Sequence, residues 1–491
     1  MPAYLLEIFV VVLGLLMLTL EAFGGKASRD RLALLGIAGL GFVLICLMFF
    51  ACCPADDLHY WGVYYFDRWA AFFKGIALLA TIIVLVMARE FAPVLKHYTC
   101  KDEGNSGLGE FYTLPVFACA GMMWMASARD LITIFVALEI VTMTFYVLVA
   151  YLRRNVGSLE AGVKYLILGA LSTGFFVYGI TWLFGVTGEF KLDAIAVALA
   201  ADDLPAVPAL FAFTLILVGL GFKIAAVPFQ LWVPDVYQGA PLPVTAFLSV
   251  GSKAAGFIVL MRVVEPFLAS PQLSGAVVVV MICIVCATLL YGNLAAIPQT
   301  NVKRLLAYSS IAHAGFLLMA LPSIPHGTDF VGPGAWAAIS FYLGGYLLMA
   351  LLCFLVVTIV SANDGHEDIG SLRGLSKRSP LLAFALLVGV ASLAGVPLTV
   401  GFFGKFFLFN IAIQDAMLTG FWVVVVLAVI GAAAGFYYYF KIIRAMYWDE
   451  PFDDASDVLT VHKLTKVAIV ALMLAIIFFG IYPKPILALL G

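Results

Sequence analysis

Three lysines lie inside apolar stretches that are long enough to cross a lipid bilayer. They are Lys223, Lys253 and Lys405. A lysine at the centre of a bilayer costs about 2.5–3.5 kcal/mol on insertion scales, so it is kept there only with a partner or beside a water-filled path. A medium of low dielectric also disfavours the charged form of an amine, which allows a buried lysine to release its proton. The three lysines therefore predict a path that carries protons.

Three other titratable residues lie at depth in similar stretches. Glu139 is the one deeply placed carboxylate. We expect a buried lysine beside it, because each group favours the charged form of the other; the alternative is a structural ion pair between two helices. Lys164 lies about two turns into its stretch and either joins the path or anchors its helix at the cytoplasmic side. His313 either relays protons, because histidine titrates near neutral pH, or is simply hydrogen-bonded to a neighbouring helix.

A further lysine, Lys74, lies close to the start of its apolar stretch. Long basic side chains near helix ends usually extend to the membrane interface. We expect this of Lys74 and leave it out of the proton path.

Two prolines are expected to break the helices that carry Lys223 and Lys405. Pro228 follows the first lysine and Pro397 precedes the second. Proline lacks a backbone N–H and clashes with the preceding turn, and broken membrane helices are tolerated only where they line protein or a water-filled cavity. The stretches LILVGLGFKIAAVPFQLW and LLVGVASLAGVPLTVGFFGKFFLF share Leu-Val-Gly, small residues and Val-Pro. This weak repetition is expected of a transporter built from two similar halves.

The composition predicts an all-α polytopic membrane protein surrounded by a lipid bilayer. Of the 491 residues, 64% are hydrophobic and 11% are charged, whereas a soluble domain carries about 25% charged residues. The net charge of -2 argues against a nucleic-acid partner. Apolar runs of about 20 residues predict about fourteen spans, near 3–22, 33–52, 70–88, 108–126, 130–152, 157–185, 207–235, 243–266, 273–296, 302–321, 333–361, 380–412, 417–447 and 465–487.

Charge in the connecting segments predicts the orientation of the chain. Alternate connectors are rich in lysine and arginine, such as Arg153 with Arg154, whereas the other set is acidic and holds few basic residues. Cytoplasmic loops carry the basic excess, so both termini are expected outside the cytoplasm. The first run contains Glu7 and has no basic leader or cleavage site, so we interpret it as a retained helix rather than a signal peptide. The basic residues of the sparse set are Arg68, Arg129, Lys191, Arg262 and Lys484.

No motif for a bound cofactor is found in the sequence. It contains no P-loop, no dinucleotide fingerprint and no clustered metal ligands. Cys283 and Cys286 form a C-x-x-C, but an Fe–S cluster needs about four thiolates, so we interpret the pair as helix packing. We expect the chain to hold no cofactor or metal and to be driven by an ion gradient or by a partner subunit.

Four long motifs give the chain a resemblance to a known family. They are KYLILGALSTGFFVYG (164–179), KIAAVPFQLWVPDVYQGAP (223–241), NVKRLLAYSSIAHAGF (301–316) and LRGLSKRSPLLAFALLVGVASLAGVPLTVGFFGKF (372–406). These resemble the proton-conducting membrane subunits of respiratory complex I, which are related to Mrp-type cation/proton antiporter subunits. The similarity extends over about residues 100–490. Within the family the chain is most similar to the N-type, because it ends directly after its last span and has Lys405 where the M-type usually has glutamate.

The resemblance implies both an architecture and a set of site residues. It implies fourteen helices with two inverted five-helix repeats, each with a half-channel. We expect three N-terminal helices in 1–105, the repeats in 106–266 and 267–447, and a last helix in 448–491. It also implies a proton relay made of Glu139, Lys164, Lys223, Lys253, His313 and Lys405.

The function implied is that of a proton-translocating subunit of an NADH:quinone oxidoreductase in a bacterial plasma membrane. Its partners would be the other membrane-arm subunits of complex I, and NADH, FMN, Fe–S clusters and quinone would be bound by partner subunits. One alternative is a subunit of an Mrp antiporter or a membrane-bound hydrogenase. Another is a scaffold subunit that only fills the membrane arm, which the titratable residues argue against because a scaffold needs none.

Overall fold

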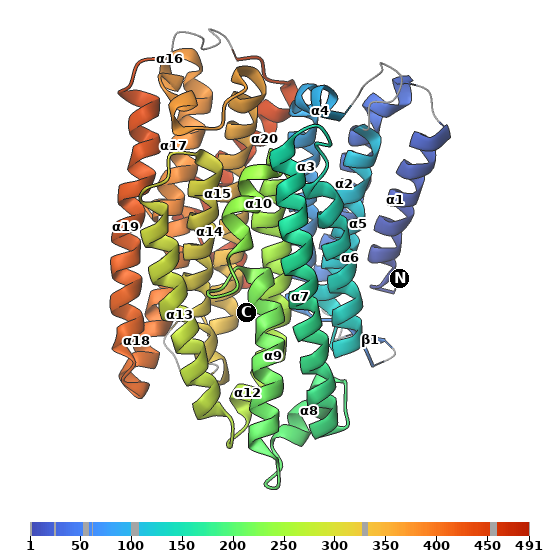
Figure 1. Ribbon diagram of the computed structural model, residues 1–491, viewed down its shortest axis with the longest axis vertical. Helices are drawn as coiled ribbons and strands as arrows, with labels where there is room; N and C mark the ends of the chain where they lie inside the picture. Colours follow the sequence, from blue (N-terminus) through green and yellow to red (C-terminus); the bar gives the residue numbers. More distant parts are fainter. Residues whose placement is uncertain are drawn as a thin grey trace.

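The protein is a bundle of long helices with one short β-hairpin at one end (Figure 1). The computed structural model describes residues 2–23, 26–52, 58–60, 62–99, 108–326, 332–451 and 459–490. The hairpin pairs β1 (Leu58–Tyr60) antiparallel with β2 (Tyr64–Phe66). We call the end of the bundle that carries it the hairpin end, and the opposite end, at the top of Figure 1, the basic end.

The helices occur in the following order. Up to the first break they are α1 (Leu5–Phe23), α2 (Lys26–Cys52), α3 (Arg68–Glu90), α4 (Ala92–Thr99), α5 (Leu108–Ser127), α6 (Leu131–Val149), α7 (Val156–Thr187), α8 (Leu192–Leu199) and α9 (Ala206–Ile224). The central part of the chain forms α10 (Trp232–Gly239), α11 (Leu242–Phe247), the π-helix η1 (Leu248–Ser252), α12 (Lys253–Ala269), α13 (Ser274–Ala296), α14 (Val302–Leu318), the 3₁₀ helix η2 (Leu321–His326) and α15 (Ala335–Asp364). The last part forms the 3₁₀ helix η3 (Ile369–Leu372), α16 (Leu375–Arg378), α17 (Pro380–Ala394), α18 (Val400–Thr419), α19 (Trp422–Tyr447), α20 (Lys463–Ile481) and α21 (Lys484–Leu490).

The prediction of an all-α membrane protein is confirmed. Within the part of the chain that the structure describes, twelve helices are long and apolar enough to cross a membrane. The two other predicted spans are 108–126, which forms α5 with Pro115 inside it, and 380–412, which is divided into α17 and α18. The number fourteen therefore stays a prediction, as does the division into two repeats.

Both predicted helix breaks are present, and they have the same local form. The residue that follows each helix has a left-handed backbone: Ala225 after α9 (φ 65) and Gly395 after α17 (φ 91). At each break the second residue past the helix donates its N–H to the carbonyl five residues before it, from Ala226 to Gly221 at 2.9 Å and from Val396 to Ala391 at 3.0 Å. This bond is the one that closes a Schellman motif and satisfies an orphan carbonyl. The shared geometry agrees with the repetition in the sequence.

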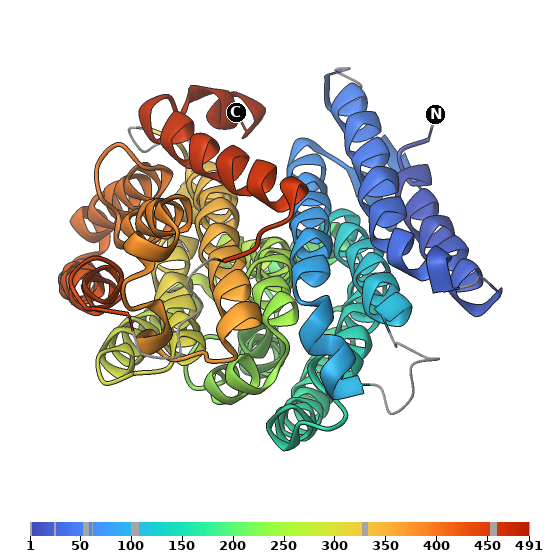
Figure 2. The same ribbon diagram turned by 90° about the horizontal axis from the view of Figure 1, so that it is seen from above.

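The most enclosed helices carry two of the predicted site residues. The spans Leu242–Ala269 and Val302–Ile324, which contain Lys253 and His313, are buried along their whole apolar length. Seen from above, α1 and α2 lie at one edge and α20 runs across the side of the bundle toward α3 (Figure 2). Because other helices enclose these two spans, their polar groups meet protein rather than lipid.

Candidate proton pathway

Four of the predicted residues form a buried set, which we call the central row: Lys223, Lys253, His313 and Lys405. Their exposed fractions are 6%, 1%, 2% and 7%. They come from α9, α12, α14 and α18, so four helices distant in sequence supply them. Each partner of these side chains is an uncharged hydroxyl or carbonyl oxygen or a phenol, as described next.

Lys223 lies in the last turn of α9, directly before the break. Its Nζ donates to the hydroxyl of Thr142 on α6. The break at Pro228 turns the chain back so that Trp232 Nε1 donates to the carbonyl of Phe222 at 3.0 Å. This bond satisfies a carbonyl at the helix end and fixes the residue next to Lys223.

Lys253 follows directly on the π-helix η1. Such single π turns occur often at functional sites because the extra residue changes the direction of the side chains that follow. Its Nζ donates to the carbonyl of Ser310 at 2.5 Å and to the hydroxyl of the same residue. The Tyr237 hydroxyl is 3.4 Å from Ser310 Oγ. The sequence did not indicate the π-helix.

His313 is held between two tyrosines. Its Nδ1 is hydrogen-bonded to the hydroxyl of Tyr342, and its Nε2 is 3.1 Å from the hydroxyl of Tyr439. Tyr439 is also hydrogen-bonded to Ser309. The next residue in the chain, Ser310, binds Lys253. A neutral imidazole has one donor and one acceptor nitrogen, so one tyrosine donates to the ring and the other accepts from it.

Lys405 lies after its break and reaches back to it. Its Nζ donates to the carbonyls of Leu393 at 3.0 Å and Ala394 at 2.8 Å, at the end of α17. It also lies 5.0 Å from the centre of the Phe316 ring, one turn from His313 on α14. The break therefore supplies the acceptors, since the last carbonyls of a helix have no partner within the helix.

Glu139 is half-buried and does not contact Lys223. Its carboxylate accepts a hydrogen bond of 2.9 Å from Thr173 on α7. Thr142, which binds Lys223, is three residues along α6 from Glu139. Residues at this spacing are neighbours on one face, with Cβ atoms about 5–6 Å apart. The expected ion pair is thus not formed here, but Glu139 lies one helical turn from Thr142, the residue that binds Lys223.

Lys164 differs from the central row because it is paired and 43% exposed. It contacts Glu160 at 2.8 Å and Asp235 at 2.7 Å, and Asp235 also binds Arg304 at 3.0 Å. These residues line an open polar depression of about 970 Å³ at the basic end, together with Gln238. Asp235 and Arg304 lie inside motifs quoted above, but only the fold shows that they meet Lys164.

Two expectations from the sequence are wrong. Lys74 does not reach the interface: it is fully buried, and its Nζ lies 2.6 Å from Oε1 of Glu7, which is also fully buried. Arg262 is not in a connector but inside α12, where it is 2% exposed and bound to Asp67 at 2.9 Å. In both cases a carboxylate from a distant segment replaces the water that an isolated cation needs. We call Glu7 and Lys74 the hairpin-end pair.

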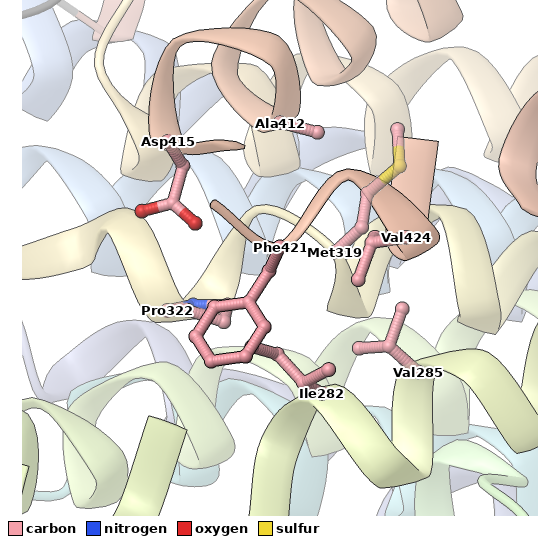
Figure 3. Close-up of a pocket in the computed structure, with 8 residues that line it drawn as sticks. All are labelled: Ile282, Val285, Met319, Pro322, Ala412, Asp415, Phe421 and Val424. Atoms are coloured by element: carbon pink, nitrogen blue, oxygen red, sulfur yellow. The ribbon is translucent and has the colours of Figure 1, made fainter. Parts of the chain in front are cut away.

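A small second cavity lies between α13, η2, α18 and α19 (Figure 3). Its volume is about 10 Å³, which is room for about one water. Asp415, ten residues beyond Lys405 on α18, is its one titratable lining residue and is 8% exposed, and its neighbours include Phe421 and Ile282. We assign no site to this cavity. Within the described residues no group of three or more His, Cys, Asp or Glu side chains is placed to hold a metal ion.

Comparison with known proteins gives the family. Residues 128–431 match the family described as NADH:quinone oxidoreductase/Mrp antiporter, TM. The protein named NADH-quinone oxidoreductase subunit N from Desulfitobacterium hafniense is 35% identical, with 98% of this chain and 95% of that protein covered. One from Heliobacterium modesticaldum with the same name is 37% identical, with 98% and 96% covered.

Solved structures agree with these relatives. A chain of respiratory complex I from Thermus thermophilus is 31% identical and superposes with a TM-score of 0.80 over 98% of both chains. A chain of the Mrp complex from Dietzia sp. DQ12-45-1b has a TM-score of 0.81 over 99% of this chain and 96% of that one, at 22% identity, which shows a common fold. Motifs, fold and relatives agree, and the chain belongs to the NADH:quinone oxidoreductase/Mrp antiporter transmembrane family.

Proposed function

We propose that this chain is a proton-translocating membrane-arm subunit of an NADH:quinone oxidoreductase. The observation that carries the proposal is the central row, in which three buried lysines are solvated by uncharged oxygens on and beside broken helices. A neutral oxygen accepts a hydrogen bond from an ammonium group but does not fix its charge as a carboxylate does. Each lysine is therefore able to lose and regain a proton without leaving an unpaired carboxylate.

The route begins at the basic end, where the polar depression admits water to Lys164 and Asp235. Protons would pass to Lys223, then to Lys253, His313 and Lys405. We place the basic end in the cytoplasm and the hairpin end outside it, in accordance with the positive-inside rule. The membrane would be a bacterial plasma membrane.

Glu139 and Lys223 would alternate between paired and separate states. In the structure Lys223 donates a hydrogen bond to Thr142 and Glu139 accepts one from Thr173, an arrangement that corresponds to the separate state. Because Thr142 and Glu139 are neighbours on one helix face, a change of the Lys223 rotamer would exchange the neutral Thr142 hydroxyl for the Glu139 carboxylate as acceptor. Pairing retains the proton on Lys223, and separation releases it.

The redox chemistry would belong to partner subunits that bind NADH, FMN, Fe–S clusters and quinone. This chain would contribute only the membrane path and would contact other membrane-arm subunits. We favour an NADH:quinone oxidoreductase over an Mrp antiporter because the relatives above 30% identity reported above carry the former name over at least 95% of their length.

Purification of the tagged chain from its membrane tests the assembly. We expect Fe–S and flavin subunits to co-purify and the isolated chain to neither bind nor oxidise NADH. A set of small antiporter subunits without a redox arm would contradict the proposal. Proton uptake by vesicles that contain the whole complex then tests the path itself.

A further inference from the structure

The hairpin-end pair belongs to a larger charged cluster outside the central row. The Tyr64 hydroxyl accepts a hydrogen bond from Lys74 Nζ at 2.6 Å and lies 3.2 Å from both carboxylate oxygens of Glu7. Asp67, the N-cap of α3, lies seven residues before Lys74 on the same helix face. Its two oxygens bind Nη2 of Arg262 at 2.9 and 3.0 Å. Glu7 and Lys74 therefore meet at the Tyr64 hydroxyl, and a second ion pair lies two turns away.

Two donors in this cluster lack a protein partner. The hydrogen bonds that the structure shows for the Arg262 guanidinium are all made by Nη2. The Nε and Nη1 atoms of Arg262 are buried and have no partner in the described residues. Ser127 is buried beside Tyr64, next to Ala126, whose carbonyl accepts from Arg262. Buried polar atoms without protein partners are normally satisfied by ordered water. The cluster therefore requires internal water.

Exposure increases stepwise from the pair to the surface. Glu7 and Lys74 are fully buried, Asp67 is 10% exposed, Arg129 is 27% exposed and Asp193 is 58% exposed. Arg129 contacts both Asp67 at 3.7 Å and Asp193 at 3.6 Å. Arg129 thus joins Asp67 to Asp193 and the solvent at the hairpin end, and Asp67 lies two helical turns from the buried pair.

Tyr65 closes the exposed end of this set. It donates to Asp193 at 3.0 Å. Burial, together with the hydrogen bond and charge of Asp193, raises the pKa of the Tyr65 hydroxyl, which keeps it a donor. The last carboxylate before the solvent is therefore oriented by both Tyr65 and Arg129.

The cluster also adjoins the helices of the central row. α3, which carries Lys74, packs against η1 and α12, the segments on either side of Lys253. Arg262 lies nine residues beyond Lys253 on α12, which is about 13 Å along the helix axis. A file of about four hydrogen-bonded waters spans such a distance.

We propose that Glu7, Lys74 and Tyr64, with the water that Arg262 requires, form a proton-release site at the hairpin end. The inference rests on the proposed function and adds a release step at the hairpin end that follows transfer through the central row. A proton passes from the Lys74 ammonium to the Glu7 carboxylate, directly or through the Tyr64 hydroxyl, which leaves a neutral amine and a neutral acid. Glu7 then gives its proton to water that leads to Asp193, and the amine accepts the next proton from the interior.

The test uses the whole complex in vesicles, with quinone reduction and proton uptake measured together. Replacement of both members, Glu7→Leu with Lys74→Met, leaves no buried charge unpaired, and such replacements of buried pairs are often neutral for stability. We expect normal assembly and proton uptake at least about fivefold slower, with quinone reduction slowed as well because the two processes are coupled, since a positioned acid–base group contributes about 10²-fold or more. The matched control removes an exposed ion pair, Glu450→Leu with Lys377→Met. Uptake equal to this control would overturn the release site.

Two further measurements keep the test decisive. If the double variant fails to assemble, hydroxyl-radical labelling of the unaltered complex decides: Tyr64, 1% exposed, should be labelled through adjacent water, whereas the equally buried Phe267 should not. An unlabelled Tyr64 would overturn the proposal. Lys223→Met, measured in the same vesicles, separates the two hypotheses. Normal proton uptake by the Lys223→Met complex would contradict the proposed function itself. Reduced uptake by Lys223→Met together with normal uptake by the double variant would contradict only the release site.

Discussion

In the central row the three lysines bind hydroxyl and carbonyl oxygens, whereas at the hairpin end Lys74 and Arg262 are neutralised by the carboxylates of Glu7 and Asp67. Both regions bury basic groups, but they stabilise them by different means. A carboxylate partner makes each cation dependent on one specific anion. Neutral acceptors leave the charge weakly held, so the central row suits transfer and the hairpin end suits retention followed by release to water.

The largest expected effect is on stability, at the hairpin end. Glu7→Gln leaves Lys74 buried without an anion, and breaking a buried pair in this way destabilises by about 3–5 kcal/mol. We expect the complex that carries Glu7→Gln to lose this subunit at a clearly lower temperature on native gels. Lys223→Met, which leaves no orphaned carboxylate in contact, should shift that temperature little. Equal shifts for the two variants would remove the distinction between the regions.

The next effect is on transport, in the central row. Lys223→Met and Glu139→Ala should each reduce proton uptake at least about tenfold while the complex still assembles, since both remove a positioned acid–base group. Quinone reduction should slow as well, because the two processes are coupled. Glu139→Asp should be milder, and the exposed Lys466→Met serves as the control. If Glu139→Ala pumps normally, its role is structural.

Substitution of Lys405 by arginine tests whether this position needs a positive charge or the ability to transfer a proton. Arginine retains its proton in proteins, so Lys405→Arg keeps a cation near the carbonyls of Leu393 and Ala394 but cannot release a proton. We expect proton uptake to fall about fivefold or more, comparable to Lys405→Ala, because a lysine that transfers protons relies on its ability to deprotonate. Vesicle uptake and native-gel assembly measure this. Normal pumping with arginine would mean that Lys405 only balances a charge on a neighbouring subunit.

The smallest expected effect is at the two tyrosines of His313. Removal of one hydroxyl costs a hydrogen bond of about 1 kcal/mol, or roughly fivefold. Tyr439→Phe and Tyr342→Phe should therefore slow proton uptake a fewfold without changing assembly. Tyr437→Phe, on the same helix as Tyr439 and 59% exposed, is the matched control. An unchanged rate in both variants would exclude the tyrosines from the path.

Much of the molecule could be predicted from local sequence. Long apolar runs fix helices because a bilayer requires every backbone group to be bonded within its own segment. Pro228 and Pro397 determine the helix breaks because proline has no backbone N–H to donate to the preceding turn, which is a local effect. Lys223, Lys253 and Lys405 were recognisable for the same reason: a charge inside an apolar run is visible without knowledge of its neighbours.

The environment of each charge was decided only by the tertiary structure. Lys74 looked like an interfacial residue, yet α1 supplies Glu7 from 67 positions away and buries both. Lys164 was expected either in the path or as an anchor at the cytoplasmic side, and only the fold shows that Asp235 binds it at the rim of a depression. The acceptors of the central row, such as Thr142 and Ser310, are ordinary helix residues in the sequence. The free energy of a buried charge depends on the atoms within a few ångströms, and in a bundle those atoms belong to other helices.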